Sequence, residues 1–294
     1  MDEPNIVCDP HPSPEWTETV VRGVDQHNVA VTGLSDYYPV GLLVSGAGGE
    51  VLAGLRGDIW GGWMNVMSLW VSVALRGRGY GAALMAHAHR YARRKSCTHA
   101  FLRTGSYEAR PFYEKLGYRL YAELSDHPIA PHRRYFLSRE FDAAAELELP
   151  TTELPIVISP LLPREAVNTI RAGIASHAHA AIGLPETEWF PHNFFLRDRD
   201  GEIVGGVLGN VWARWLYVDY VWVDRSIRGK GHASRLMKAA EQGAIARGCA
   251  HSFLGTFSFQ ARPLYEKLGY HVFGEERDHP KGHTHYLLTK RLVG

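Results

Sequence analysis

The sequence is poor in cysteine, lacks a long apolar run and carries almost no net charge. Its three cysteines are too few, and odd in number, for a disulfide framework, so we expect a reduced cytoplasmic setting. No apolar run approaches the roughly 20 residues of a membrane span, and the acidic, proline-rich start is unlike a signal peptide. Because 32 Lys and Arg residues oppose 31 Asp and Glu residues, charge gives no reason to expect nucleic acid or a membrane as partner.

The chain contains an internal repeat. The segment ARPFYEKLGY begins at Ala109, and the nearly identical ARPLYEKLGY begins at Ala261. The same offset relates the two halves of the sequence over a long stretch without a gap. Since a period of this length can bury a core of its own, we predict two homologous domains, 1–142 and 156–294, joined by a linker at 143–155.

Each repeat has the same expected order of elements, which is that of a mixed α/β protein whose sheet is covered by helices. Helical patterns cover 15–28 and 164–179. A hairpin, a further strand, a glycine-rich loop, a helix, an apolar strand, a short helix and two closing strands follow in each repeat. Cys97 and Cys249 occupy equivalent positions, and we interpret them as buried packing residues.

A glycine-rich loop joins a predicted strand to a predicted helix in both repeats. It reads VALRGRGYG from Val73 and RSIRGKGHA from Arg225. Free amides and a partial positive charge at the start of a helix bind phosphate groups. The glycine spacing excludes a Walker loop and the dinucleotide fingerprint. A tight turn is the alternative interpretation, but the presence of the pattern in both repeats favours phosphate binding.

The loop R-x-x-G-x-G/A followed by A-R-P-x-Y-E-K-L-G-Y resembles the GNAT superfamily of acetyl-CoA-dependent N-acyltransferases. The resemblance covers 51–135 and 203–292, and it implies two tandem domains, each with a mixed, mostly antiparallel central sheet flanked by helices. It also implies acetyl-CoA as the cofactor, held by backbone amides of the loop. The residues implied to bind it are Val71, Val73, Arg76, Gly77, Arg78, Gly79, Tyr80, Gly81, Ser106, Val223, Arg225, Arg228, Gly229, Lys230, Gly231, His232, Ala233 and Ser258. At Ser106 and Ser258 the family often has Asn instead.

The reaction that the resemblance implies is direct acetyl transfer. An amine loses its proton and attacks the thioester carbonyl, and a backbone N–H near Val71 or Val223 stabilises the oxyanion. The family match suggests Tyr113 or Tyr265 as the general acid that protonates the departing thiolate, which suits a phenol facing a thiol. The alternative is that both tyrosines only pack in the core.

Asp219 is the candidate general base. It lies in the apolar strand WLYVDYVWV, where desolvation raises the pKa of a carboxyl group toward neutrality. A structural, hydrogen-bonded acid is the alternative. The first repeat has Met67 at the equivalent position, so we expect the C-terminal domain to be the main catalyst. His127 and His279 are alternative bases.

Histidines give no metal site in the sequence. His283 and His285 could share a strand face, but we find no cysteine or carboxylate cluster beside them, and we expect no metal. Tryptophans and a phenylalanine border the expected cleft, and part of them could form an aromatic groove for a small amine. They are Trp60, Trp63, Trp189, Phe190, Trp212 and Trp215.

The leading hypothesis is a tandem N-acetyltransferase that acts on a primary amine of a small molecule, such as an antibiotic, a metabolite or a peptide-like acceptor. It would be a monomer that forms an internal pseudo-dimer, or a homodimer. The alternatives are an enzyme in which both domains turn over, a protein N-acetyltransferase, and a non-catalytic CoA-binding regulatory or scaffold protein.

Overall fold

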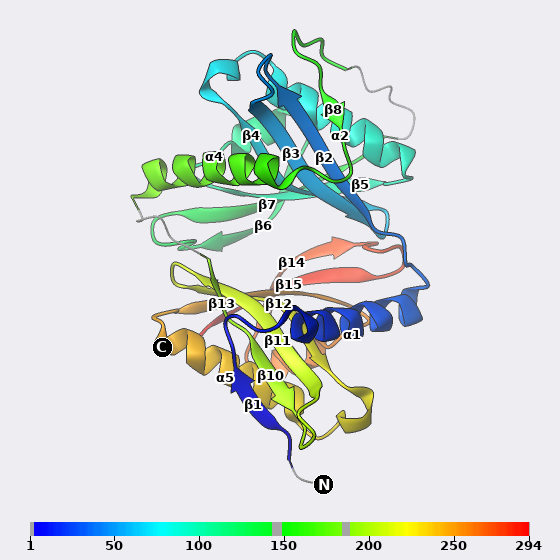
Figure 1. Ribbon diagram of the computed structural model, residues 1–294, viewed down its shortest axis with the longest axis vertical. Coiled ribbons are helices and arrows are strands. Elements are labelled where there is room, and N and C mark those ends of the chain that lie inside the picture. Colours follow the sequence, from blue (N-terminus) through cyan, green and yellow to red (C-terminus); the bar gives the residue numbers. More distant parts are fainter. Residues whose placement is uncertain (1–2, 143–148, 184–188, 294) are drawn as a thin grey trace.

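The computed structural model describes residues 3–142, 149–183 and 189–293. It forms two lobes, each built on one mixed sheet with helices packed against it (Figure 1). All strand pairs are antiparallel except one in each lobe, which confirms the mixed, mostly antiparallel architecture. No helix of the described residues is long and apolar enough to cross a membrane.

The first lobe is a continuous stretch of chain from the second strand to the fourth helix. Its seven-stranded sheet has the order β6-β7-β5-β4-β3-β2-β8. Its elements are β2 (Tyr38–Ser45), β3 (Val51–Trp60), β4 (Trp63–Val71), the 3-10 turn η1 (Val73–Leu75), α2 (Tyr80–Arg94), β5 (His99–Gly105), α3 (Arg110–Lys115), β6 (Arg119–Ser125), β7 (Arg133–Glu140), β8 (Val157–Ile158) and α4 (Arg164–Ile182).

The second lobe combines both ends of the chain. Its main strands have the order β1-β10-β11-β12-β13-β15-β14, and β9 pairs with β11 as the eighth strand. Its elements are β1 (Asn5–Cys8), α1 (Pro14–Thr32), β9 (Phe190–Pro191), β10 (Phe194–Arg197), β11 (Ile203–Trp212), β12 (Trp215–Val223), the 3-10 turn η2 (Arg225–Ile227), α5 (His232–Ala246), β13 (His251–Phe257), α6 (Arg262–Lys267), β14 (His271–Arg277) and β15 (Thr284–Arg291).

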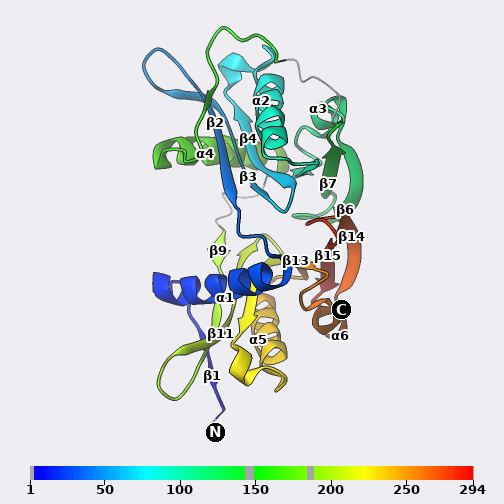
Figure 2. The same ribbon diagram turned by 90° about the vertical axis from the view of Figure 1, so that its right-hand side faces the viewer.

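The two repeats exchange their first strand and first helix. Strand β1 of the first repeat pairs with β10, and α1 packs on β11 and β12 of the second lobe. Reciprocally, β8 of the second repeat pairs with β2, and α4 packs on β3 and β4 of the first lobe. In Figures 1 and 2 the blue helix α1 therefore lies on the lobe that holds the C-terminal half, and the green helix α4 lies on the other.

Each exchanged helix meets its sheet through a glycine. The Gly23 backbone of α1 lies against the indole of Trp222, and a Cβ atom there would come within 2.2 Å of its Nε1. The equivalent Gly173 of α4 lies against Trp70, where a Cβ atom would come within 2.0 Å of Nε1. Any larger residue would push the helix away from the tryptophan, so the close approach explains a glycine in the middle of both helices.

The boundaries of the repeats therefore differ from those of the lobes. The chain passes between the lobes after α1 and again after α4, whereas the predicted linker at 143–155 lies between β7 and β8, which both belong to the first lobe. Residues 143–148 of that linker lie outside the described residues. The division of the sequence into 1–142 and 156–294 stays a prediction about the repeats.

Equivalent hydrogen bonds tie the lobes together. Trp63 Nε1 donates to the carbonyl oxygen of Asp278 at 2.8 Å, and Trp215 Nε1 donates to that of Asp126 at 3.1 Å. The edge strands β6 and β14 also contact each other. Cys97 and Cys249 are buried in the cores of separate lobes, as expected for packing residues.

Candidate active site

Both sheets open where their one parallel strand pair stops. In the second lobe β12 and β13 are paired only from Trp215–His251 to Val218–Leu254, although both strands continue further. In the first lobe β4 and β5 separate in the same way after Val66. Beyond these points one edge of each strand has no partner strand, so a ligand can insert between them.

A β-bulge lies at each point of separation. In the second lobe Leu208 pairs with Tyr220 and Gly209 with Val218, so Asp219 is the extra residue. In the first lobe the same shift leaves Met67 as the extra residue. Bulges of this kind bend a strand and redirect a side chain, and they are frequent beside active sites. The fold therefore places the predicted base, and its apolar counterpart, at the openings of the two sheets.

Each opening contains a cleft. The second cleft, of about 350 Å³, is lined by Asp219 to Val223, by Arg228 and Ala233 of the loop region, and by Tyr265. The first cleft is larger, about 690 Å³, and is lined among others by Val71, Arg76 and Tyr113. Three residues from the exchanged helices complete each wall. They are Gly23, Val24 and His27 in the second cleft and Gly173, Ile174 and His177 in the first.

The glycine-rich loops have the conformation of an anion cradle. Gly77, Gly79, Gly229 and Gly231 all have φ between 73° and 83°, which strongly favours glycine. A Cβ atom at any of the four would meet nothing within 4 Å, so open space lies above these backbones. Gly79 and Gly231 precede α2 and α5, whose first-turn amides have no acceptor within the helix. A diphosphate fits this arrangement.

The arginines that begin the two loops have a structural role. Arg228 Nε donates to the carbonyl oxygen of Val223 at 2.8 Å, and Arg76 Nε donates to that of Val71 at 3.1 Å. Each guanidinium therefore fastens its loop to the end of the strand before it. In the first loop Gly77, Gly79, Tyr80 and Gly81 also line the cleft.

The other predicted cofactor residues lie outside the cleft linings. Ser106 Oγ accepts the amide of Arg133, and Ser258 Oγ accepts that of Thr284, so these serines attach the loop after β5 or β13 to the neighbouring strand. Val73 is 80% exposed. The remaining members of this group are Arg78, Arg225, Gly229, Lys230, Gly231 and His232.

Tyr113 and Tyr265 lie in the clefts to which the sequence assigned them. Burial raises the pKa of both phenols above the ordinary value, so both are protonated at neutral pH. Neither hydroxyl has a hydrogen-bond partner among the described residues. A buried hydroxyl that borders a cleft without a protein partner is available to a ligand. Tyr118 and Tyr270 are buried core residues.

Asp219 is the titratable group with the clearest functional signature. Its carboxylate borders the second cleft and accepts a hydrogen bond from Asn210 Nδ2 at 2.9 Å. Asp219 is exposed at the mouth of the cleft, but the protein atoms around its carboxylate desolvate it and raise its pKa to about 6, although Asn210 and Arg103 act in the opposite direction. A carboxylate with this pKa is available as a base at neutral pH.

Tyr220 follows Asp219 in the strand. Burial raises the pKa of its phenol, and the charges of Asp25, Asp219 and Asp58 raise it further. Tyr220 lines the second cleft. Tyr217 does not: its hydroxyl is hydrogen-bonded to His127 of the first lobe, in the buried contact between the lobes.

A second pocket, the first acceptor pocket, continues the first cleft. It has a volume of about 580 Å³ and shares Met67, Arg103 and Glu108 with that cleft. Trp189 and Trp212 of the second repeat form part of its wall, and a groove that binds an amine there stays a prediction. Trp63 and Trp215 are buried between the lobes instead.

The sequence interpretation missed the arginines of this pocket and the helices that close the clefts. Arg103 could have been found, because its counterpart in the second repeat is Gly255 and such a difference between repeats marks divergence of a site. The exchange of helices has no signal in the sequence, since exchanged and unexchanged arrangements bury the same residues.

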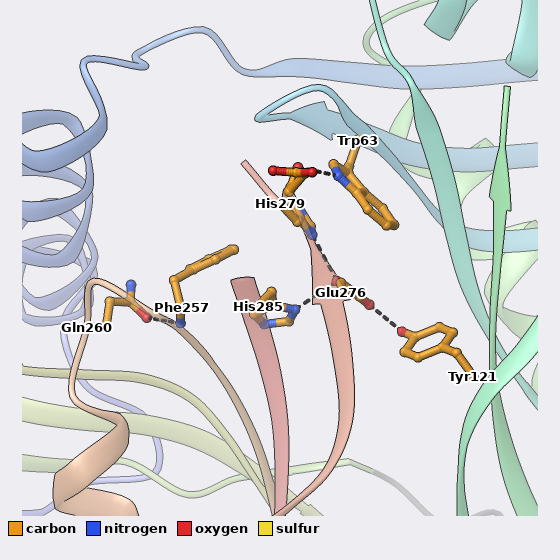
Figure 3. Close-up of polar contacts among 8 residues, drawn as sticks. Trp63, Tyr121, Phe257, Gln260, Glu276, His279 and His285 are labelled. Atoms are coloured by element: carbon orange, nitrogen blue, oxygen red, sulfur yellow. Dashed lines mark hydrogen bonds and ion pairs between the residues drawn. The ribbon is translucent and has the colours of Figure 1, made fainter. Parts of the chain in front are cut away.

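One expectation about the histidines is wrong. No carboxylate was expected beside His285, but Glu276 Oε2 accepts hydrogen bonds from His279 Nδ1 and His285 Nδ1, both at 2.8 Å (Figure 3). The ligand atoms of these three residues lie within 4.8 Å of one another. The other carboxylate oxygen accepts the hydroxyl of Tyr121 from the first lobe, so protein donors already serve both oxygens. The group connects the lobes, and the absence of a metal stays a prediction.

Comparison with known proteins identifies the family. The profile of the acetyltransferase (GNAT) family matches the chain twice, at residues 11–118 and 165–270. The two matches cover most of the chain, which therefore belongs to this family and is an acetyl-CoA-dependent acyltransferase.

Individual relatives correspond to one repeat. A blasticidin-S acetyltransferase of Streptomyces morookaense is 43% identical over 93 residues, which are 31% of this chain and 68% of the relative. An acetyltransferase of Agrobacterium fabrum is 30% identical over 136 residues, 46% of this chain and 98% of the relative. A crystal structure of an acetyltransferase from Bacillus cereus, 32% identical with a TM-score of 0.41, covers 45% of this chain and 94% of its own.

The loop geometry predicts the stoichiometry of cofactor binding. We expect calorimetry to find two acetyl-CoA molecules per chain, and only one in Gly231→Val. A β-branched residue is strained at φ +83°, and the loop backbone would have to change. Gly248→Val is the matched control, because Gly248 has the same φ and open surroundings but lies at the other end of α5. An unchanged stoichiometry in Gly231→Val would contradict the assignment of this loop.

Proposed function

We propose that the second lobe transfers the acetyl group of acetyl-CoA to a primary amine of a small molecule by direct attack. The observation that carries the proposal is the position of Asp219. Its carboxylate lies at the bulge where β12 and β13 separate, in the same cleft as Tyr265, and its pKa is raised to about 6. The first lobe has Met67 at this position and so lacks an equivalent base.

The chain's own groups support a role for each part of the second cleft. Acetyl-CoA supplies an acyl group that is already activated, so no protein nucleophile is needed. The amides at the start of α5 would hold its diphosphate, and the free edge of β12 near Val223 would offer a backbone donor to the carbonyl oxygen. The Tyr265 hydroxyl, protonated and without a protein partner, would give its proton to the departing sulfur.

The charge around Asp219 suits an acceptor that arrives as an ammonium ion. The carboxylate of Asp219 attracts a cation, and the phenol of Tyr220 in the same cleft can accept a hydrogen bond from it. Asp219 would then take the proton that makes the amine nucleophilic. Similarity to a protein named blasticidin-S acetyltransferase is in keeping with a small amine as acceptor.

A second candidate is that both lobes catalyse transfer. The first cleft is the larger of the two, about 690 Å³ against about 350 Å³, and contains Tyr113. Glu108 also borders it, with a carboxylate that accepts the amide of Gly105 and the hydroxyl of Thr104. Acceptors taken by the first lobe would then differ from those of the second, since the two sites share few acceptor-side residues.

Replacement of Asp219 tests the base. We expect Asp219→Asn to lower kcat/KM for an amine acceptor by about 100- to 10,000-fold. In the wild type the base must be deprotonated, so kcat/KM should rise with pH through about 6, and this limb should disappear in the variant. Thiol release from acetyl-CoA across an amine library measures both. Asp200→Asn, in the exposed turn before β11, should change neither. Retention of the limb near pH 6 in Asp219→Asn would exclude this carboxylate as the base.

The two tyrosines distinguish the lobes. With an acceptor taken by the second lobe, Tyr265→Phe should lower kcat by about 100-fold, whereas Tyr113→Phe should leave it unchanged. Both variants remove a hydroxyl without a protein partner, so their melting temperatures should equal that of the wild type. The reverse result, loss of activity in Tyr113→Phe alone, would assign catalysis to the first lobe.

A further inference from the structure

The first acceptor pocket has the opposite charge to its counterpart in the second lobe. Three arginines from β5, β7 and α4 line it, and Glu108 is its only carboxylate among the described residues. The equivalent positions of the second lobe lack all three cations. The pairs are Arg103 and Gly255, Arg134 and His285, and Arg171 and Val21. The second lobe instead places the carboxylate of Asp219 at its bulge.

The three guanidinium groups are available to a ligand. None of them forms an ion pair with a carboxylate of the described residues. Glu108, which shares the pocket, directs its carboxylate to Gly105 and Thr104 instead. An arginine in a cleft has lost part of its hydration, and an ion pair with a bound anion compensates for this loss.

Packing holds two of the arginines in place. The Arg103 guanidinium carbon lies 5.7 Å from the ring centre of Phe136 and 5.5 Å from that of Phe253, so both lobes support it. Protein atoms around the guanidinium lower the pKa of Arg103, although the residue stays exposed to solvent. Arg134 lies 5.8 Å from the ring centre of Tyr217, and its NH1 is 3.3 Å from His127 Nε2. These side chains are therefore preorganised to bind an anion.

A flat aromatic wall lies in the same pocket. The rings of Trp189 and Trp212 are stacked, with centroids 5.3 Å apart and an angle of 4° between their planes. Trp189 remains 48% exposed, although the ring of Tyr217 also lies 4.7 Å from it, so part of this pair is accessible to a ligand. Planar groups stack well on such a surface. The pocket thus combines a cationic side with an aromatic side.

We propose that the first acceptor pocket binds an amine that carries both an aromatic ring and a carboxylate, sulfonate or phosphate group. The anionic group lies against the arginines and the ring against Trp189. Because the pocket continues into the first cleft, the amine faces the acetyl group of acetyl-CoA there. The C–N bond then forms as the C–S bond breaks, and the proton lost by the amine balances the one gained by the thiol of CoA. The identification as an acceptor rests on the second candidate function, in which both lobes catalyse transfer, whereas binding of the anion does not.

Calorimetry with matched probes tests the proposal without turnover. The full chain is first saturated with CoA, so that the loops are occupied. It is then titrated with pairs of amines that carry an aromatic ring. One member of each pair has a carboxylate, sulfonate or phosphate group, and in the other member an amide or ester takes the place of this anionic group. Phenylalanine with phenylalaninamide is one such pair. We expect at least one anionic member to bind about tenfold or more tightly than its neutral counterpart, because charge-assisted hydrogen bonds to arginine are lost in the latter.

Arginine variants locate the binding. Arg171→Met and Arg134→Met should each reduce this preference about tenfold, and Arg171 lies on the exposed side of α4, where its loss leaves the fold intact. Arg133→Met is the control, since it removes the same charge from β7 but pairs with Glu123 outside the pocket. The proposal would be overturned if probes with and without the anionic group bound equally well, or if no anionic probe bound. It would also be overturned if all three variants behaved identically. Anion binding without acetyl transfer would instead contradict only the second candidate function, in which both lobes catalyse transfer.

Discussion

The contact between a helical glycine and a tryptophan of the other repeat is the constraint on which the clefts depend. Gly23 against Trp222 and Gly173 against Trp70 bring each helix close enough to the sheet to form one wall of the opening beside the bulge. Because the helices are exchanged, each cleft contains residues of both repeats. A change in one repeat therefore alters both sites, and neither repeat can provide a complete cleft in this arrangement.

Duplication left the cofactor side nearly unchanged and allowed the acceptor side to diverge. The loops retain similar positive φ angles and the same arginine hydrogen bond to the preceding strand, and the later helices α3 and α6 retain the same tyrosine. We therefore expect both lobes to bind the same ligand. At the bulge and in the pockets beyond it, Asp219 replaces Met67 and Gly255 replaces Arg103. The physical result is one acidic and one cationic acceptor region on either side of the same interface, close enough for Arg103 to lower the pKa of Asp219.

Local signals in the sequence predicted the elements and the loops well. Helices at 15–28 and 164–179 are observed at Pro14–Thr32 and Arg164–Ile182, and the glycines of both loops adopt the expected conformation. The raised pKa of Asp219 also follows from an acid in an apolar strand. Contacts between segments far apart in the sequence could not be predicted, because they depend on how the two lobes pack against each other. Examples are the hydrogen bonds of Glu276 to His279 and His285, the position of Tyr217 at the interface and the sheet that each exchanged helix covers. A comparison of the repeats at every position would have shown the arginine pocket.

The exchange itself is tested most directly by producing residues 1–142 and 149–294 as separate polypeptides, without residues 143–148. We predict that they purify together as a one-to-one complex that binds acetyl-CoA, because each supplies the first strand and helix of the other's sheet. Each alone should aggregate or unfold without cooperativity, since the apolar face that α1 or α4 covers would be exposed. If either fragment alone is a monomer that unfolds cooperatively and binds acetyl-CoA as tightly as the intact chain, the helices are not exchanged and the account is contradicted.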